Sequence, residues 1–482
     1  MTFRGLGPRG TLNTMSIESN PTKMWSGRFR EPLNATFEQW QRSFPFDVRL
    51  LAQEVAASKA HAKAIAAAGI LTEAELATMV GGLDEVLASS GTDWYATVAT
   101  APEAEDIHHF VEMQLTKAIG TLALKLHTGR SRNEQIATDM RLFVRDAIDR
   151  TAQGLRKWAL ALVELAETAG DAVMPSYTHL QRAEPVLVAH WLLAYVAMIE
   201  RDISRLTDAR RRMNFCPLGS GAVAGATLAL DRAIAARELN FTAPTPNSMD
   251  ATSDRDFMLE FTQVLATMGV HVSRFAEELT LYSTAEFGFL DLPEAFSTGS
   301  SAMPQKKNPD FTELLRGKTA RLVGAATTLS MLIKGLPLAY NKDLQEGQEP
   351  IFDAADTAAG VLSILPAFTR SLKFNFARMK TAATTGYLNA MAAATYLSNK
   401  GVPFRKAHEI VGHAVRLGLE SGRELDALTL AELHALSPAF AEDFFVAISL
   451  EATLDCHDVI GGTARVRVGA ALVEARGRLA GS

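Results

Sequence analysis

Residues 186–199 read VLVAHWLLAYVAMI, and this stretch decides the fold. It is apolar nearly all round a helix, and it runs directly into the charged residues Glu200-Arg201-Asp202. At about 14 residues it is too short to cross a bilayer, which takes about 20 residues as a helix. A helix of this kind cannot bury its whole surface against one neighbour. The stretch therefore predicts a helix that is buried by several neighbours, partly from other copies of the chain.

Helical periodicity predicts four further long helices around this one. From about residue 132 to 170, apolar residues such as Leu155, Trp158 and Leu162 recur at the spacing of one helix face. Pro185 suits the first turn of the helix that holds the decisive stretch, because an N–H group is unpaired there anyway. Long helices joined by loops are typical of a bundle. We expect the five at about 132–170, 185–213, 254–287, after Pro309, and at about 349–372.

Shorter helices are predicted on both sides of the bundle. Between Ser43 and about Ser90, Thr72 followed by Glu75 has the spacing of a capping box at a helix start. Past Phe374 glycine and proline become frequent, which indicates short helices. We therefore expect an all-α chain of three domains with a long central five-helix bundle. The expected divisions are a disordered lead at 1–22, an N-terminal helical domain at 23–128, the bundle domain at 129–375 and a small C-terminal helical domain at 376–482.

The composition of the 482 residues excludes several classes of protein. Hydrophobic residues make up 48% and aromatic residues 7%, a mixture that favours helices over strands. The net charge of -6 shows no basic excess, so we expect no nucleic-acid partner. Cys216 and Cys456 are too few for a disulfide framework or a cysteine-rich zinc site, and they indicate a reducing compartment. Residues 1–24 lack the apolar segment of a secretory signal, so we expect a soluble, cytoplasmic protein without a membrane partner.

Polar residues collect in four loops between the apolar helices. The first loop, 127–133, reads HTGRSRN and comes directly before the first bundle helix. Its donors and the free N–H groups of a helix N-terminus can bind an anion, although ordinary N-capping by Ser131 explains the segment equally well. The second loop, 177–182, contains His179, which is a candidate proton-transfer group or a structural histidine. The third loop, 247–256, is interpreted as a helix-capping region with charge pairs.

The fourth loop, 299–310, has the composition of an anion-binding turn. Gly299 permits unusual backbone angles, two serines follow it, and Lys306 and Asn308 come a few residues later. Such a loop can direct N–H and ammonium groups at an anion that develops during a reaction. The loop is not a phosphate-binding P-loop, because the Gly-Lys-Ser/Thr order is missing. The sequence also lacks the Gly-x-Ser-x-Gly pattern of a nucleophilic serine at a strand-to-helix turn.

The fourth loop also carries a family resemblance. Its pattern Gly299-Ser300-x-x-Met303-x-x-Lys306-x-Asn308 resembles the signature of the fumarase/aspartase superfamily, whose members eliminate fumarate from succinyl-bearing substrates. Further segments resemble the argininosuccinate lyase family in particular, and the resemblance runs from about Met24 to the C-terminal region. They are Trp25-x-Gly27-Arg28-Phe29, Glu105-Asp106-Ile107-His108, 127–133, 177–182, Ser253-Asp254-Arg255-Asp256 and 338–345.

The resemblance implies an activity and an assembly. The activity is the reversible β-elimination of argininosuccinate to arginine and fumarate, in arginine biosynthesis or the urea cycle, without a metal or an organic cofactor. The physiological direction stays open, because both settings use the same reaction. The assembly is a homotetramer, in which the central bundles form a twenty-helix core and three different subunits build each active site.

The resemblance also implies roles for individual residues. Removal of a proton beside a carboxylate creates a dianionic intermediate, which needs positive charge and hydrogen-bond donors. Ser300 would be the base, and Lys306 and Asn308 would hold the carboxylate where charge develops. His179, oriented by Glu313, would assist proton delivery to the leaving nitrogen. The other expected site residues are Ser131, Arg132, Asn133 and Thr178 at the substrate carboxylates, Ser43, Tyr340 and Gln345 at the arginine portion, and Asp106, His108 and Arg255 as supporting or substrate-ordering groups.

Three positions depart from the family's pattern. Glu134 stands where the family usually has Asp, and Glu184 stands where it usually has Gln. Gln348 stands where the family has Lys, which removes a cation on the substrate side. The effect of Gln348 on the contacts to the arginine portion is therefore open.

Two alternatives remain for the function. A sister lyase of the superfamily would act on adenylosuccinate, malate or aspartate, but the sequence has no added basic cluster for the phosphate of a purine nucleotide. A catalytically silent structural relative would have lost a site residue. By contrast, all the expected base, acid and supporting residues are present, namely Ser300, His179, Lys306 and Glu313. We therefore expect an active carbon–nitrogen lyase.

Overall fold

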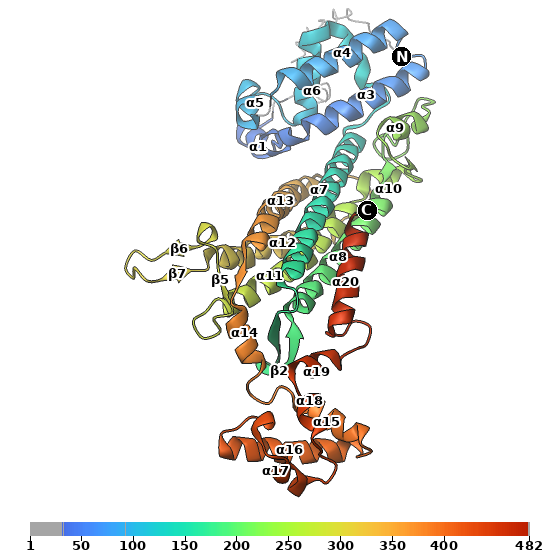
Figure 1. The fold of residues 1–482 in the computed structure, drawn as a ribbon. Helices are drawn as coiled ribbons and strands as arrows, with labels where there is room; N and C mark the ends of the chain where they lie inside the picture. Colours follow the sequence, from blue (N-terminus) through green and yellow to red (C-terminus); the bar gives the residue numbers. More distant parts are fainter. Residues whose placement is uncertain (1–30, 32, 92, 481–482) are drawn as a thin grey trace, which may run out of the picture.

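The computed structural model describes residue 31, residues 33–91 and residues 93–480. Helices dominate this part of the chain, so the predicted all-α class is confirmed. The expected disordered lead at 1–22 and the motif at 25–29 lie outside the described residues. Figure 1 shows an elongated molecule, with the N-terminal helices at one end, the long helices in the middle and the C-terminal lobe at the other end.

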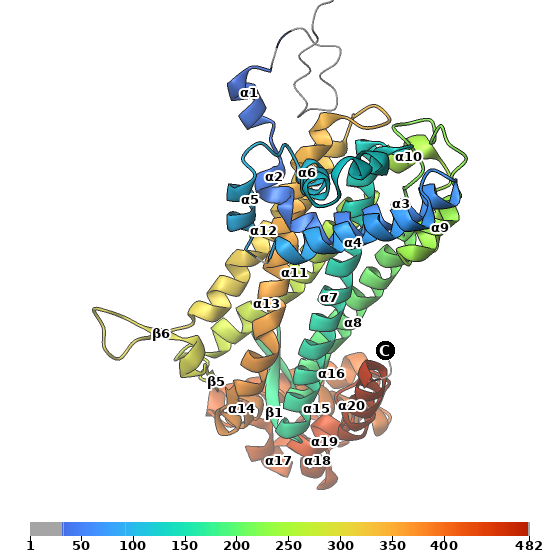
Figure 2. The ribbon, with the colours of Figure 1, turned by 90° about the horizontal axis from the view of Figure 1, so that it is seen from above.

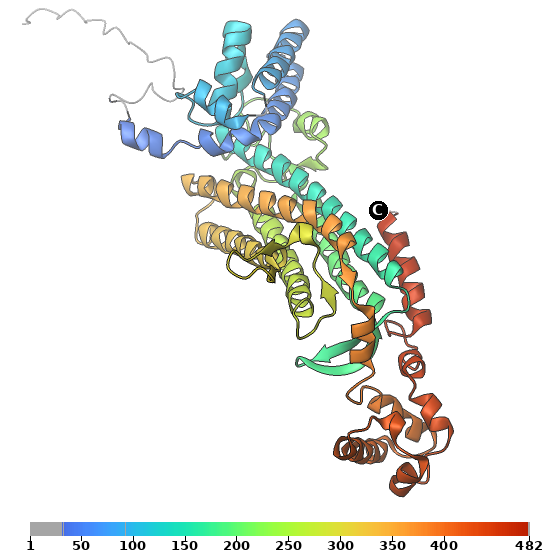
Figure 3. The ribbon, with the colours of Figure 1, turned by 60° about the vertical axis from the view of Figure 1, so that its left-hand side comes forward.

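Five long helices make up the central bundle, as the periodicity predicted (Figures 1 and 3). The decisive apolar stretch lies mainly in the second of them, which packs against the first and the third. Its side chains Leu192, Val196 and Ile199 are almost completely buried. The five are α7 (Arg132–Ala169), α8 (Val188–Met213), α11 (Asp256–Tyr282), α12 (Asp310–Ile333) and α13 (Gln348–Ser371).

The expectation that Pro185 begins the second long helix is wrong. Pro185 lies in β2 (Gln181–Leu187), which pairs antiparallel with β1 (Val173–Thr178), and it stands opposite Pro175. Prolines are tolerated here because both strands of a two-stranded ribbon are edge strands. The predicted loop around His179 is therefore the end of a β-hairpin, and α8 begins only after it.

The N-terminal helices pack over one end of the bundle (Figure 2). Phe44, Leu83 and Phe110 are buried among them, in a core that continues into the bundle. The predicted capping box is confirmed, because the Thr72 hydroxyl accepts the N–H of Glu75 and the Glu75 carboxylate accepts the N–H of Thr72. The elements are α1 (Ala35–Trp40), α2 (Phe44–Asp47), η2 (Val48–Leu50), α3 (Leu51–Ala67), α4 (Glu73–Ser89), α5 (Trp94–Thr100), α6 (Ile107–Ile119) and η3 (Gly120–His127).

The segment between α8 and α11 returns to the same end of the bundle. Its helix α9 packs on α3, and Phe241 shares a small buried core with Ala57 and Leu142. The elements of this segment are β3 (Phe215–Cys216), α9 (Arg232–Glu238), β4 (Ala243–Pro244) and α10 (Ser248–Ser253). Asn247 caps α10, as the interpretation of the third loop as a capping region predicted.

Two more short segments connect the later bundle helices. Between α11 and α12 lie β5 (Leu290–Asp291), η4 (Glu294–Phe296), β6 (Thr298–Gly299) and β7 (Lys307–Asn308). Figure 1 shows the β6–β7 hairpin projecting sideways from the bundle. Between α12 and α13 lies η5 (Lys342–Gly347). The two predicted catalytic and arginine-binding loops, 299–310 and 338–345, belong to these connections.

The part of the chain that follows α13 divides between two hydrophobic cores. Leu397, Leu433 and Phe444 lie in a separate core in the C-terminal lobe. By contrast, α20 returns along α7 and α8, and its residues Val468 and Ala475 belong to the core of the bundle. Helix α20 thus packs with the bundle although the sequence analysis placed it in the C-terminal domain. The elements are β8 (Lys373–Phe374), α14 (Phe376–Ala383), α15 (Ala390–Asn399), α16 (Phe404–Ser421), η6 (Leu425–Ala427), α17 (Leu430–Leu436), α18 (Asp443–Ala447), α19 (Leu450–Asp455) and α20 (Arg465–Ala480).

The segment Lys342–Ser371, which comprises η5 and α13, has the length and apolar composition of a membrane span. In the structure 61% of its most apolar window is buried inside the protein. This burial is that of a core helix in a helical bundle.

Candidate active site

The loop 127–133 ends at the capped N-terminus of α7. The Ser131 hydroxyl accepts the N–H of Asn133 at 3.3 Å, and the Glu134 carboxylate accepts the N–H of Ser131 at 3.2 Å. The second carboxylate oxygen of Glu134 accepts the N–H of Gly221 at 2.7 Å. The side-chain amide of Asn133 donates to the carbonyl of Ala222 at 3.3 Å. N-capping by Ser131 is therefore confirmed, and the carboxylate of Glu134 also ties the loop to the segment that precedes α9.

Two polar residues, Ser43 and Asp106, lie close to Arg132 of this loop. The Ser43 hydroxyl donates to Asp47 at 2.6 Å, and the guanidinium of Arg132 lies 3.4 Å from the carboxylate of Asp106. Burial, reinforced by the charge of Asp106, raises the pKa of Asp47 to about 8. The carboxylate of Asp106 therefore forms an ion pair with Arg132 in this group.

Three more predicted residues complete this group. The side-chain amide of Gln345 donates to the carbonyl of Gln41, two residues before Ser43, at 3.1 Å. Burial raises the pKa of Tyr340, while the charge of Arg255 lowers it, so the tyrosine hydroxyl lies in the field of that arginine. Arg255 is only 2% exposed, and burial lowers its pKa to about 10. One chain therefore brings the predicted arginine-end residues to the same end of the bundle as Arg132.

His108 lies in a buried polar cluster directly behind this group. Its Nδ1 lies 2.8 Å from a carboxylate oxygen of Glu54 and 3.5 Å from one of Asp139. The sequence analysis assigned a role to His108 but missed both acids. Glu54 is the single acid of α3 and gave a weak signal, whereas Asp139 is one of six acids in α7 and gave none.

His179 and Thr178 lie at the exposed tip of the β1–β2 hairpin. His179 and Leu180 have φ angles of 54° and 58°, and two successive positive φ values are what a type I′ hairpin turn requires. Neither residue is glycine, so this backbone is strained and the rest of the hairpin must hold it. Within the described chain the imidazole of His179 makes no hydrogen bond and no ion pair. Within a single copy of the described chain, His179 therefore lacks the hydrogen-bond partner that a structural histidine would have.

Ser300 lies in the β6–β7 hairpin, where its side chain is partly exposed. Its Oγ accepts the backbone N–H groups of Ala302 at 3.2 Å and Met303 at 3.1 Å. Hydrogen bonds donated to an oxygen favour its charged form over its neutral form. The hairpin thus surrounds the hydroxyl with the N–H donors that the assignment of Ser300 as base requires.

The remaining predicted catalytic residues lie on the same hairpin and on α12. Lys306 is exposed, Asn308 pairs with Thr298 across the hairpin, and Glu313 lies in the exposed first turn of α12. The nearest cation to Glu313 in the described chain is Arg316, at 3.9 Å. The predicted pairing of Glu313 with His179 is therefore absent from a single copy of the described chain.

The predicted site residues form three separate groups in one chain (Figures 1 and 3). The group around Arg132 lies at the N-terminal end of the bundle, and the hairpin that ends in His179 lies towards the C-terminal lobe. The β6–β7 hairpin with Ser300 projects from the side of the bundle. A single chain does not bring these three groups together.

The two other departures from the family's pattern lie in different places. Gln348 begins α13 and is 4% exposed, and its side-chain oxygen has no hydrogen-bond partner in the described chain. One carboxylate oxygen of Glu184 lies 3.5 Å from His457. Glu184 therefore faces the segment after α19. Gln348, by contrast, lies three residues after Gln345 in the chain.

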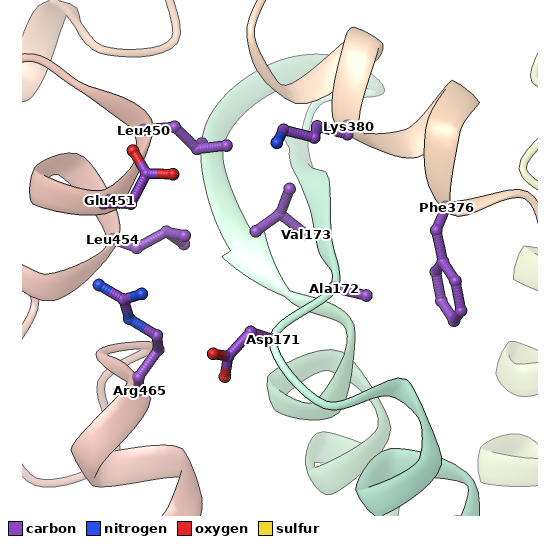
Figure 4. A pocket seen from close by; sticks show the side chains of 9 residues that line it. All are labelled: Asp171, Ala172, Val173, Phe376, Lys380, Leu450, Glu451, Leu454 and Arg465. Carbon is purple, nitrogen blue, oxygen red and sulfur yellow. The ribbon is translucent and has the colours of Figure 1, made fainter.

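A pocket at the base of the β1–β2 hairpin has a different character. Figure 4 shows its charged side chains Asp171, Lys380, Glu451 and Arg465 around an apolar floor. None of the residues that line it has a predicted catalytic or substrate-binding role. This pocket is therefore not part of the candidate active site.

Comparisons with known proteins first define the class. Residues 27–324 match a family model described as "Lyase". The crystal structure of EDDS lyase in complex with formate is 26% identical, with a TM-score of 0.79, and the match covers 93% of this chain and 91% of that chain. A class II fumarase from Schistosoma mansoni has the same fold at 15% identity, with a TM-score of 0.70 over 84% of this chain and 90% of its own. The fold and these matches define a lyase of the fumarase/aspartase superfamily.

Closer relatives then give the family. Residues 387–455 match a model described as the argininosuccinate lyase C-terminal region. The argininosuccinate lyase of Acidobacterium capsulatum is 62% identical over 473 residues, which cover 95% of this chain and 97% of the relative. That of Koribacter versatilis is 55% identical over 457 residues, with coverage of 95% and 97%. The chain belongs to the argininosuccinate lyase family, so it is a carbon–nitrogen lyase that splits argininosuccinate into arginine and fumarate, a reaction of arginine biosynthesis.

Proposed function

We propose that the enzyme performs this elimination in active sites that several copies of the chain assemble within a homotetramer. The observation that carries the proposal is the separation of the groups around Arg132, His179 and Ser300 in one chain. All three are needed for the chemistry, and none can reach the others by a change of rotamer. Association of antiparallel copies along the bundle can bring opposite ends of different chains together.

Exposed apolar side chains support an assembly through the bundle. Several large apolar residues on the long helices are 42% to 60% exposed, which is unusual for helices at the centre of a molecule. Contact with the bundles of other subunits would bury them, in the proposed twenty-helix core. These residues are Val270 on α11, Leu314, Val323 and Met331 on α12, and Ile364 on α13.

The proposed reaction begins with the transfer of a proton from carbon to Ser300. The base attacks the C–H bond beside the carboxylate that becomes part of fumarate, and the electron pair moves into that carboxylate as a dianion. The N–H groups of Ala302 and Met303 stabilise the serine oxygen, while Lys306 and Asn308 stabilise the dianion. The dianion then collapses, the C–N bond breaks, and fumarate forms.

The leaving nitrogen belongs to the guanidinium of arginine and needs a proton as the bond breaks. We assign its delivery to His179, with Glu313 of another copy orienting the imidazole. The exposed tip of the β1–β2 hairpin leaves both ring nitrogens of His179 free for these two contacts. No metal or organic cofactor takes part in this proposed sequence of steps.

The remaining residues bind and order the substrate in this proposal. Gln348, whose side-chain oxygen has no hydrogen-bond partner in the described chain, stands where the family has Lys, so a neutral amide replaces a cation. The substrate carboxylates are bound by Ser131, Arg132, Asn133 and Thr178. The arginine portion is bound by Ser43, Tyr340 and Gln345. The substrate and the residues that bind it are ordered by Asp106, His108 and Arg255. We further propose a cytoplasmic location and the domain divisions at 128 and 375, with α20 packed back on the bundle.

The assembly is tested by placing a charge in the proposed bundle contact. Val323→Asp should yield particles smaller than four chains and lower the turnover strongly. Burial of even a neutral polar group without a hydrogen bond costs about 2–7 kcal/mol, and burial of an unpaired charge costs more. Val446→Asp is the control, because it places the same charge on an apolar residue of the C-terminal lobe that is 72% exposed, against 45% for Val323. Light scattering gives the particle mass, and fumarate release gives the turnover. A monomer with the turnover of the unchanged enzyme would contradict the proposal.

A further inference from the structure

A buried polar cluster joins α3, α6 and α7 behind the loop 127–133. Glu54 is 1% exposed, His108 3% and Asp139 0%. One carboxylate oxygen of each acid and a ring nitrogen of His108 all lie within 4.8 Å of one another. Three ionisable groups so close together in an apolar interior must balance their charges locally.

Glu54 has the contacts of an ionised carboxylate. One of its oxygens accepts hydrogen bonds from the Ser58 hydroxyl at 2.6 Å and the Gln135 amide at 3.2 Å. The other oxygen accepts from Nδ1 of His108 at 2.8 Å. The guanidinium of Arg130 lies 4.0 Å from Glu54 and donates to Ser58 at 2.9 Å. Four donors or cations thus converge on one carboxylate.

Of these groups only His108 approaches Asp139, with Nδ1 at 3.5 Å from one carboxylate oxygen. Both of its carboxylate oxygens are buried without a hydrogen-bond partner in the described chain. An ionised carboxylate in that state is costly, because it has lost its water and gained no donor. A proton on Asp139 removes this charge and gives the carboxyl group a donor that can face the neighbouring carboxylate of Glu54.

We propose that one proton lies between Asp139 and Glu54 and is bound to Asp139. The two carboxyl groups together position His108 and the loop 127–133. The protonated carboxyl leaves Glu54 as the only anion of the cluster. Glu54 then holds His108 through its contact with Nδ1. Through Ser58, Glu54 also holds Arg130, which belongs to the loop 127–133. The residues that follow Arg130 in this loop are proposed to bind the substrate carboxylates. In this respect the inference rests on the proposed function of Ser131 to Asn133.

Other charged groups around the cluster agree with one neutral carboxyl. Burial and the charge of Glu54 raise the pKa of Asp139 well above its usual value. Nε2 of His61 on α3 donates to the Thr128 carbonyl at 3.0 Å, and burial lowers the pKa of this histidine to about 3, so it adds no positive charge. Burial also lowers the pKa of His127 in the loop. Arg130 therefore supplies a permanent positive charge beside Glu54.

A divalent cation is the other occupant that this ligand set can accept. Two carboxylates and an imidazole suit several transition metals. However, one oxygen of Glu54 already accepts from Ser58, and the 2.8 Å distance between the other oxygen and Nδ1 of His108 is that of a hydrogen bond, with a proton between the two atoms. The contacts therefore favour a shared proton, and a bound metal becomes an outcome of the test.

The test compares Asp139→Asn with Glu54→Gln in the full-length enzyme. An asparagine has the shape and neutrality of a protonated aspartate, so kcat/KM should stay within about threefold of the unchanged enzyme. Glu54→Gln removes the anion that holds His108 and Arg130, and kcat/KM should fall about 10–100-fold, mainly through KM. Infrared difference spectra should show the C=O stretch of a protonated carboxyl at neutral pH, and this band should be lost in Asp139→Asn. Elemental analysis should find no stoichiometric metal.

Each opposite result overturns the inference. Absence of the carboxyl band shows that Asp139 is ionised, and an equal loss of kcat/KM in both variants shows that its charge is needed. A metal that copurifies with the enzyme and is lost in Asp139→Asn shows that a cation occupies the cluster. Circular dichroism and light scattering confirm that both variants fold and assemble. The infrared band needs no turnover, so a failure of the proposed roles of Ser300 or His179 leaves this test intact.

Discussion

Ser300→Ala is expected to lower kcat about 10²–10⁴-fold, because it removes the general base itself. The melting temperature and the particle mass should stay unchanged, since Ser300 lies in a projecting hairpin whose N–H groups can bond to water instead. Binding of substrate should also persist, because the proposed carboxylate contacts come from other segments. Turnover is measured by fumarate release, and stability by thermal unfolding.

Ser301→Ala is the matched control for this prediction. Ser301 is the neighbouring exposed serine on the same hairpin, and the alanine at that position should leave kcat within about threefold. A Ser300→Ala enzyme that turns over like the unchanged enzyme would remove Ser300 from the mechanism. An equal loss in both variants would mean that the hairpin, rather than the Ser300 hydroxyl, is what the reaction needs.

His179→Asn is expected to lower kcat about 10²-fold, a large but less complete loss. Water can partly replace a proton donor at the leaving nitrogen, whereas it cannot replace the base on carbon. Asparagine is the suitable substitution because it tolerates the positive φ of 54° at this position, so the hairpin turn is kept. The kinetics are again followed by fumarate release.

The control for His179 is an exposed histidine away from the hairpin. His408 lies on α16 in the C-terminal lobe, and His408→Asn should leave kcat unchanged. A His179→Asn enzyme with undiminished kcat and only a changed KM would assign His179 to substrate binding instead of proton delivery.

Local features of the sequence were sufficient to predict the five long helices and the start of one short helix. The spacing of Leu155, Trp158 and Leu162 predicted α7, and Thr72 with Glu75 predicted the start of α4, because both signals depend only on neighbours within a few turns. Pro185 misled the prediction of α8, since proline suits a helix start and an edge strand equally well. Only the partner strand, which contains Pro175, decides between them.

The site was less accessible from the sequence. The family pattern predicted roles for Ser300, His179 and Arg132 in a site shared by three subunits, but it gave no positions for them, and the structure shows where one chain places each group. Glu54 and Asp139 escaped notice because their significance appears only where α3 and α7 pack together. Tertiary contacts of this kind have no signature in local spacing.

The shared site is tested most directly by mixing the two inactive variants. Chains with Ser300→Ala and chains with His179→Asn should regain activity when they form mixed assemblies, because some sites then receive Ser300 from one chain and His179 from another. With random mixing in equal amounts, about a quarter of the sites should be complete if the two residues come from different subunits of a symmetric assembly. Mixed particles that stay as inactive as either parent at every ratio would contradict an active site built from several copies of the chain.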